Sequence, residues 1–275
     1  MIVCKELDTT FESKEDLFKA LKENKDLIIN AKKSQVLKSC DKGVSVKTKC
    51  IDVSKVSSEA NKELFKDDNY YYIVVNTTGI LDSHKDLHVN GIWNKTAKEQ
   101  NRKNYLVDTH VMSMGTTIAR KENVEIFVTE IPYSAIGKSY KGNTEALIYK
   151  VPKDKIVSPL AKEWLDSGDD IEASVRMQYV NVQLAMNSDS VEDKEEKANY
   201  DNYINSIANK SDFEKIDYYW IVKEAKNKGE SSLVLQGSNH VTGQIQIEPS
   251  NDTQSKEVVN NTSADLLTFY KTLNS

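Results

Sequence analysis

The stretch LDSHKDLHVNGIW, residues 81–93, places acidic and imidazole side chains at every second position. These residues are Asp82, His84, Asp86 and His88. A spacing of two puts side chains on one face of a β-strand, and carboxylate and imidazole groups are common ligands of zinc and iron. Neighbours on one strand face stand about 6–7 Å apart, however, so at most two of them reach the same ion. A polar strand or turn is therefore favoured, and no metal or other cofactor is predicted.

A histidine and a serine lie in apolar surroundings that suit nucleophilic catalysis. His110 ends the run NYLVDTH, where a neutral imidazole could act as a general base near pH 7. Ser174 lies inside the apolar run IEASVRMQYVNVQLA. A serine becomes a nucleophile only when a base accepts its proton and a third group orients the base. Triads assemble in any chain order, so spacing does not test this, and a hydrogen-bonded histidine and a packed serine remain alternatives.

The elements that must position these residues form a mixed pattern of strands and helices. Strands are predicted at 43–53, 69–83, 104–111, 116–132, 144–152 and 171–187, and a β-hairpin at 217–239 with its turn at 227–229. Helices are predicted at 12–28, 94–104, 158–170 and 190–210. Ser13 and Ser158 are the expected N-caps of the first and third helices, and Pro159 follows Ser158 at the first helical position. This order predicts a mainly antiparallel β core with peripheral helices.

Composition limits the class of function. The net charge is −5, and Lys supplies nearly all positive charge, so no direct nucleic-acid role is predicted. The three cysteines form no CxxC pair, which is typical of a reducing compartment. Neither a signal peptide nor a membrane-spanning segment is predicted, so a soluble, cytosolic protein is expected. The GxGxxG, GxxxxGK[ST], HExxH and GxSxG signatures are absent from the sequence.

Four short motifs, in this order, resemble the prohead (capsid-maturation) serine proteases of tailed bacteriophages. The first contains Asp82, Asp86, Gly91 and Trp93; the second is His110 in its apolar context; the third is SVRM from Ser174; the fourth is Glu230, Ser232 and Val234, followed by Asn239. The resemblance covers residues 70–242, and each motif alone is short. Arg176 departs from the pattern, because the family commonly has glycine there.

This resemblance implies the fold of herpesvirus assembly proteases, an α+β structure with a mainly antiparallel closed β-barrel core surrounded by helices. It also implies that Ser174 is the nucleophile and His110 the general base. Glu230 would orient His110, with Glu224 in reserve. His240 is a further candidate, because triads of the herpesvirus type use a second histidine.

The function implied is a serine endopeptidase that processes scaffold and major capsid protein and also cleaves itself. It would act in the host cytoplasm, inside the assembling prohead, and a homo-oligomer is expected because the herpesvirus relatives need a dimer. Arg176 either narrows the cleft or anchors a group near the oxyanion. It keeps open the alternative of a catalytically impaired assembly or scaffold protein with the same fold. Three regions are predicted: an N-terminal segment packing on the core (1–42), a protease-like domain (43–242), and a flexible linker with a short terminal helix (243–275).

Overall fold

The computed structural model describes residues 1–34, 37–38, 51–52, 64–168, 171–235 and 243–246 of the 275-residue chain. Five α-helices lie in this part: α1 (Lys14–Glu23), α2 (Lys25–Ser34), α4 (Asn94–Gln100), α5 (Pro159–Ser167) and α6 (Lys194–Tyr203). The first six strands are β1 (Ile2–Cys4), β2 (Thr9–Phe11), β3 (Leu37–Lys38), β4 (Ile51–Asp52), β5 (Tyr70–Thr77) and β6 (Asp86–His88). The others are β7 (Tyr105–Asp108), β8 (Thr117–Ala119), β9 (Glu125–Pro132), β10 (Asn143–Pro152), β11 (Glu172–Met186), β12 (Tyr218–Val234) and β13 (Gly243–Gln246). Within these residues, no helix is long and apolar enough to cross a membrane.

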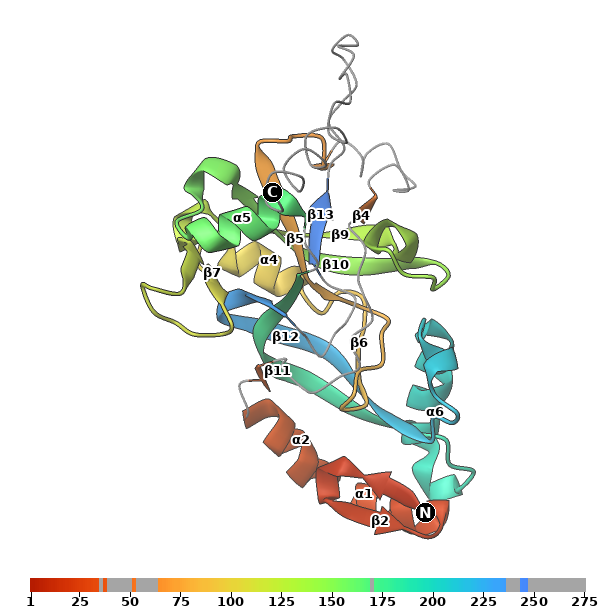
Figure 1. Ribbon diagram of the computed structural model, residues 1–275. Helices are drawn as coiled ribbons and strands as arrows, with labels where there is room; N and C mark the ends of the chain where they lie inside the picture. Colours follow the sequence, from red (N-terminus) through yellow and green to blue (C-terminus); the bar gives the residue numbers. More distant parts are fainter. Residues whose placement is uncertain (35–36, 39–50, 53–63, 169–170, 236–242, 247–275) are drawn as a thin grey trace, which may run out of the picture.

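The described strands form open sheets, so the predicted closed β-barrel is wrong (Figure 1). One sheet has the order β4-β13-β5-β10-β9, a second has the order β3-β11-β12-β7-β8, and β1 and β2 form a small third sheet. Strand β12 pairs with β11 on one side in antiparallel fashion, and with β6 and β7 on the other side in parallel. Closure would require edge strands of the two large sheets to hydrogen-bond to one another. Among the described residues, the two sheets instead meet through their side chains.

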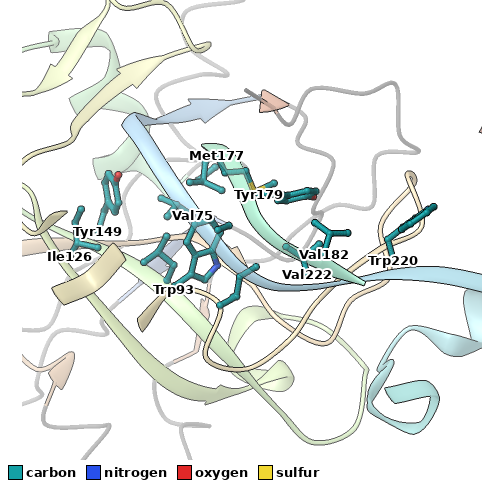
Figure 2. Close-up of a cluster of buried hydrophobic side chains, with 14 of the residues drawn as sticks. Val75, Trp93, Ile126, Tyr149, Met177, Tyr179, Val182, Trp220 and Val222 are labelled. Carbon is teal, nitrogen blue, oxygen red and sulfur yellow. The ribbon is translucent and has the colours of Figure 1, made fainter. Parts of the chain in front are cut away.

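The main core lies between these two sheets. Val75 of β5 and Tyr149 of β10 belong to the same buried cluster as Met177 of β11 and Val222 of β12. Figure 2 shows these side chains gathered around Trp93, which directly precedes α4. Strand β5 is buried on both faces, because Tyr72 and its neighbours on the other side pack into a second cluster. Burial of this apolar surface, at about 25 cal/mol per Å², holds the two open sheets together without a closed hydrogen-bond ring.

Local capping signals in the sequence operate as predicted. The Ser13 side chain accepts a hydrogen bond from the Asp16 backbone at the start of α1. Ser158 caps α5 with Pro159 at the first position, and Gly168 ends α5 in the left-handed region. The first predicted helix is divided at Asn24 into α1 and α2. Side chains of both helices join the main core.

The predicted hairpin at 217–239 is wrong. Residues Tyr218–Val234 form one continuous strand that runs beside β11 for almost its whole length (Figure 1). The Asn-Lys-Gly sequence that suggested a turn leads into a β-bulge instead: Asn227 still pairs with Met177, and Arg176 of β11 lies opposite the three residues 228–230. Gly229 makes this possible with a φ of 89°.

The C-terminal prediction is only partly within the described residues. Residues 243–246, expected to begin a flexible linker, form β13, which pairs with β4 and β5. Residues 247–275, including the predicted terminal helix, lie outside the described residues, as does most of the strand predicted at 43–53.

Candidate active site

Ser174, His110 and Glu230 meet in the structure, although they come from three different parts of the chain. The Ser174 Oγ lies 2.8 Å from His110 Nε2. His110 Nδ1 lies 2.9 Å from Glu230 Oε1 and 3.2 Å from Oε2. All three residues are buried, with exposed fractions of 2%, 4% and 0%. The three residues therefore have the order and spacing of a nucleophile, a base and the group that orients the base.

Ser174 lies on the face of β11 that points away from the core. Side chains alternate along a strand, and Ala173, Val175 and Met177 all belong to the main core cluster. The intervening residues Ser174 and Arg176 therefore share the opposite face. Alternation is visible in the sequence, but it does not show what covers that face.

His110 is presented by a tight turn with an unfavourable backbone. The Val111 backbone N–H donates to the Asp108 carbonyl at 3.0 Å, and Thr109 and His110 between them have φ values of 48° and 58°. This is the pattern of a type I′ turn, which normally uses glycine or asparagine. Thr109 is β-branched, so its left-handed conformation costs of order 1–3 kcal/mol. Such strain is held where the surroundings over-determine it, and functional sites are the usual places.

The strained turn is held against β12. Thr109 N–H donates to the Leu233 carbonyl at 3.1 Å, and His110 N–H donates to Ser232 Oγ at 2.8 Å. The Ser232 hydroxyl in turn donates to Glu230 Oε2 at 2.9 Å. Ser232 thus binds both the base and its orienting carboxylate. The sequence contains it only as a member of the fourth motif, with no local sign of this double role.

The hydrogen bonds define which nitrogen of His110 can act as a base. The carboxylate of Glu230 only accepts, so it requires a proton on Nδ1. The lone pair of Nε2 then faces Ser174 and accepts its hydroxyl proton. This arrangement can generate a serine alkoxide equivalent and stabilise the imidazolium that forms.

Arg176 lies on the same face as Ser174, two residues further along β11. It is partly buried, and its Nε has no hydrogen-bond partner among the described residues. On β12, Lys228 of the bulge is exposed opposite it. Strand alternation thus puts Arg176 and the nucleophile on the same face of β11 and leaves both interpretations of Arg176 open.

The other site candidates do not join the triad. Glu224 lies opposite Asn181 on the β11–β12 pair, six residues from Glu230, and its carboxylate is 3.5 Å from Lys95 Nζ. His240 lies outside the described residues. Of the two glutamates considered, only Glu230 contacts His110.

The Asp82–His88 stretch does not line one strand face. The Lys85 backbone N–H donates to the Asp82 carbonyl, which closes a turn at 82–85, and the strand contains only residues 86–88. His84 is exposed in this turn. The described residues contain no cluster of three or more His, Cys, Asp or Glu side chains able to hold a metal ion.

Asp86 and His88 belong to a buried polar network instead. The Tyr179 hydroxyl donates to Asp86 Oδ2 at 2.9 Å and lies 3.1 Å from His88 Nε2. Lys32 Nζ pairs with Asp86 Oδ1 at 2.6 Å, and Asn76 Oδ1 lies 3.1 Å from His88 Nδ1. Burial lowers the pKa of His88 to about 4, so its imidazole is neutral at pH 7. These residues stabilise the junction of β5, β6, β11 and α2.

The chain matches no family model, no curated protein and no solved structure. The geometry of the site and the motif resemblance are therefore the basis for its proposed role.

Proposed function

We propose that the protein is a serine endopeptidase of the Ser–His–Glu type. The observation that carries this proposal is the continuous hydrogen-bonded chain Ser174–His110–Glu230, with contacts of 2.8 and 2.9 Å. All three polar side chains are buried, and His110 is held on a strained turn, which is a combination typical of functional sites. An esterase would use the same three groups. The motif order favours peptide bonds as substrates.

The proposed reaction has two steps. Ser174 Oγ attacks the peptide carbonyl while its proton passes to His110 Nε2, and the collapse of the tetrahedral intermediate breaks the C–N bond. His110 gives the proton to the leaving amine, which leaves an acyl-enzyme. Water then attacks the ester with His110 again as the base, releasing the carboxylic acid and restoring Ser174. Glu230 orients the imidazole and stabilises the imidazolium in both steps.

The proposed substrates come from the resemblance to prohead proteases. They are the scaffold protein and the major capsid protein of a tailed phage, cut inside the assembling prohead in the host cytoplasm, together with the protease's own chain. A homo-oligomer belongs to the same proposal.

A second candidate is a catalytically impaired assembly or scaffold protein. Two observations favour it: Ser174 is 2% exposed, and Arg176 occupies the same strand face. A peptide reaches the nucleophile only if the groups that cover this face move. Such a protein would keep the triad geometry without turnover.

Intact-mass spectrometry tests the proposal directly. The purified chain and Ser174→Ala would each be incubated with the cognate scaffold and capsid proteins. Fragments from the wild type alone are expected, because loss of the nucleophile costs several orders of magnitude in rate. Identical fragments from both proteins would remove Ser174 from the mechanism, and intact substrates in both reactions would favour the impaired protein.

Arg176→Gly separates the two roles of the guanidinium. Labelling of Ser174 by a serine-reactive phosphonate would accelerate in this variant if Arg176 narrows the cleft. It would slow if Arg176 supports the oxyanion. A chelator such as EDTA should leave labelling unchanged in both proteins.

A further inference from the structure

The bulge in β12 carries Glu230, and a set of buried polar contacts surrounds it. Strand pairing with β11 is regular from Glu172 to Val175, then three residues of β12, 228–230, face the single Arg176. The bulge gives β12 two more residues than β11 at this point, so it shifts the pairing register by two residues and leaves the alternation of side chains unchanged. Ser174 therefore lies opposite Ser232 and not opposite Glu230, so the bulge sets the position of Glu230 along β12 relative to Ser174.

Asn227 and Ser231 bracket the bulge and are joined by their side chains. Asn227 Nδ2 donates to Ser231 Oγ at 3.2 Å and also to the Tyr149 hydroxyl of the facing sheet. Asn227 and Ser231 are 1% and 0% exposed. The amide thus ties the two ends of the bulge to each other and to β10.

Helix α4 holds the backbone of the same residue. Gln100 Nε2 donates to the Asn227 carbonyl at 2.9 Å, and the Asn227 N–H donates to Thr96 Oγ1 at 3.3 Å. The backbone groups inside a strand normally hydrogen-bond to neighbouring strands. Here two helix side chains hydrogen-bond to the backbone of one strand residue, which constrains its position. Asn227 is therefore fixed through both its backbone and its side chain.

We infer that Asn227, acting through Ser231 and the bulge, is a positioning residue that aligns the Glu230 carboxylate with His110 Nδ1. This inference rests on the proposed function for its effect on turnover. Its geometric part does not, because the contact between His110 and Glu230 exists with or without catalysis. A displacement of about 1 Å in such a contact costs of the order of 10²-fold in rate.

The test compares Asn227→Ala and Ser231→Ala with Asn209→Ala. Asn209 is a matched control: it is 2% exposed, and its side chain bonds to the Leu81 backbone at 2.9 and 3.0 Å, in a different part of the protein. Each variant is measured by kcat and KM on a peptide containing the cleavage site. Each is also measured by the downfield proton resonance of a histidine Nδ1–H bonded to a carboxylate.

We expect Asn227→Ala to lower kcat by about 10²-fold with KM within twofold, and to weaken or shift the downfield resonance of His110. Ser231→Ala removes a single hydroxyl and should act in the same direction even if Asn227→Ala does not fold. Asn209→Ala should reduce thermal stability and leave kcat and the resonance unchanged. Unchanged kcat and resonance in folded Asn227→Ala and Ser231→Ala would overturn the inference and show that the cluster only stabilises the sheet.

The two proposals can fail separately. If the wild type neither cleaves the peptide nor reacts with the phosphonate, the proposed function fails. The resonance still reports whether Asn227 holds Glu230 against His110. If cleavage occurs but the variants retain wild-type values of both kcat and resonance, only the positioning role fails.

Discussion

At the scale of single residues, the site depends on which carboxylate faces His110. Glu230 accepts from His110 Nδ1 and from Ser232, whereas Glu224 pairs with Lys95 at 3.5 Å. A buried carboxylate fixes the imidazole tautomer, and an amide of the same shape does not require the same tautomer. The two glutamates therefore offer a direct comparison on one strand.

Glu230→Gln should lower kcat by about 10³–10⁴-fold, because the amide no longer holds the proton on Nδ1. Glu224→Gln is the matched control and should change kcat by less than about twofold, since its partner is a partly exposed lysine. Peptide hydrolysis and phosphonate labelling of Ser174 both measure the effect. Equal losses in the two variants would contradict the assignment of Glu230.

At the scale of elements, the bulge in β12 requires one glycine. Gly229 has a φ of 89°, and no described heavy atom stands within 4 Å of where a Cβ would be. An alanine there is strained by its backbone alone and not by a clash. Gly142, in the loop before β10, has the same φ of 89° and the same open surroundings.

Gly229→Ala and Gly142→Ala should each reduce the free energy of unfolding by about 1 kcal/mol. Only Gly229→Ala should also lower kcat, because relief of the strain changes the bulge and moves Glu230. Urea unfolding and peptide hydrolysis measure the two effects. Equal activity in the two variants would show that the site tolerates a changed bulge.

The network between β6 and β11 predicts a dependence of stability on pH. Burial lowers the pKa of folded His88 to about 4, below the value of about 6.5 for an unfolded histidine. Between these two pH values the unfolded chain binds a proton that the folded protein does not. The contribution of His88 to the free energy of unfolding is therefore fully present above about pH 6.5 and is lost as the pH decreases towards 4. The charged groups that face His88 are Asp86 and Lys32, and both contribute to the same network.

From pH 7 to pH 5 the wild type should lose about 2 kcal/mol more stability than His88→Gln. Urea unfolding at the two pH values provides the measurement. His84→Gln, at an exposed position in the preceding turn, is the control and should follow the wild type. The same loss in His88→Gln as in the wild type would exclude His88 as its source.

At the scale of the whole molecule, the N-terminal helices are attached to the core by ion pairs as well as by apolar contacts. Lysines of α1 and α2 pair with acids from later parts of the chain: Lys14 with Asp217, Lys22 with Asp193, Lys25 with Glu196 and Lys32 with Asp86. The last pair is the most buried, with side chains 12% and 3% exposed. Its loss leaves a carboxylate uncompensated in the core.

Lys32→Met should therefore lower the free energy of unfolding by about 3 kcal/mol, and the double variant Lys32→Met/Asp86→Asn should recover part of that loss. Lys22→Met is the control for a more exposed pair and should have a much smaller effect. Thermal unfolding followed by circular dichroism compares the four proteins. No recovery in the double variant would indicate that Lys32 stabilises mainly by packing against Trp220, whose ring centroid is 5.4 Å from its Nζ.

The sequence by itself determined the local features of this protein. Ser13 and Ser158 cap their helices as predicted, because a cap depends on residues three positions apart. Alternation along 172–178 already assigns Ser174 to the face opposite Ala173 and Val175, because side chains alternate in any strand. The motif order selected Ser174, His110 and Glu230 as candidates, and the structure brings these three together.

Only the tertiary structure decided which residues that lie far apart in the sequence come into contact. The choice of Glu230 over Glu224 follows from the bulge and from the parallel pairing of β12 with β7, which brings residues 105–108 beside 230–233. The Asn-Lys-Gly segment favours a turn locally, but pairing with β11 over its whole length makes it a bulge. The incorrect hairpin came from this local turn pattern, whereas the incorrect closed barrel came from the family resemblance. Open and closed sheets differ in contacts between distant strands. Local patterns contain no information on which edges meet.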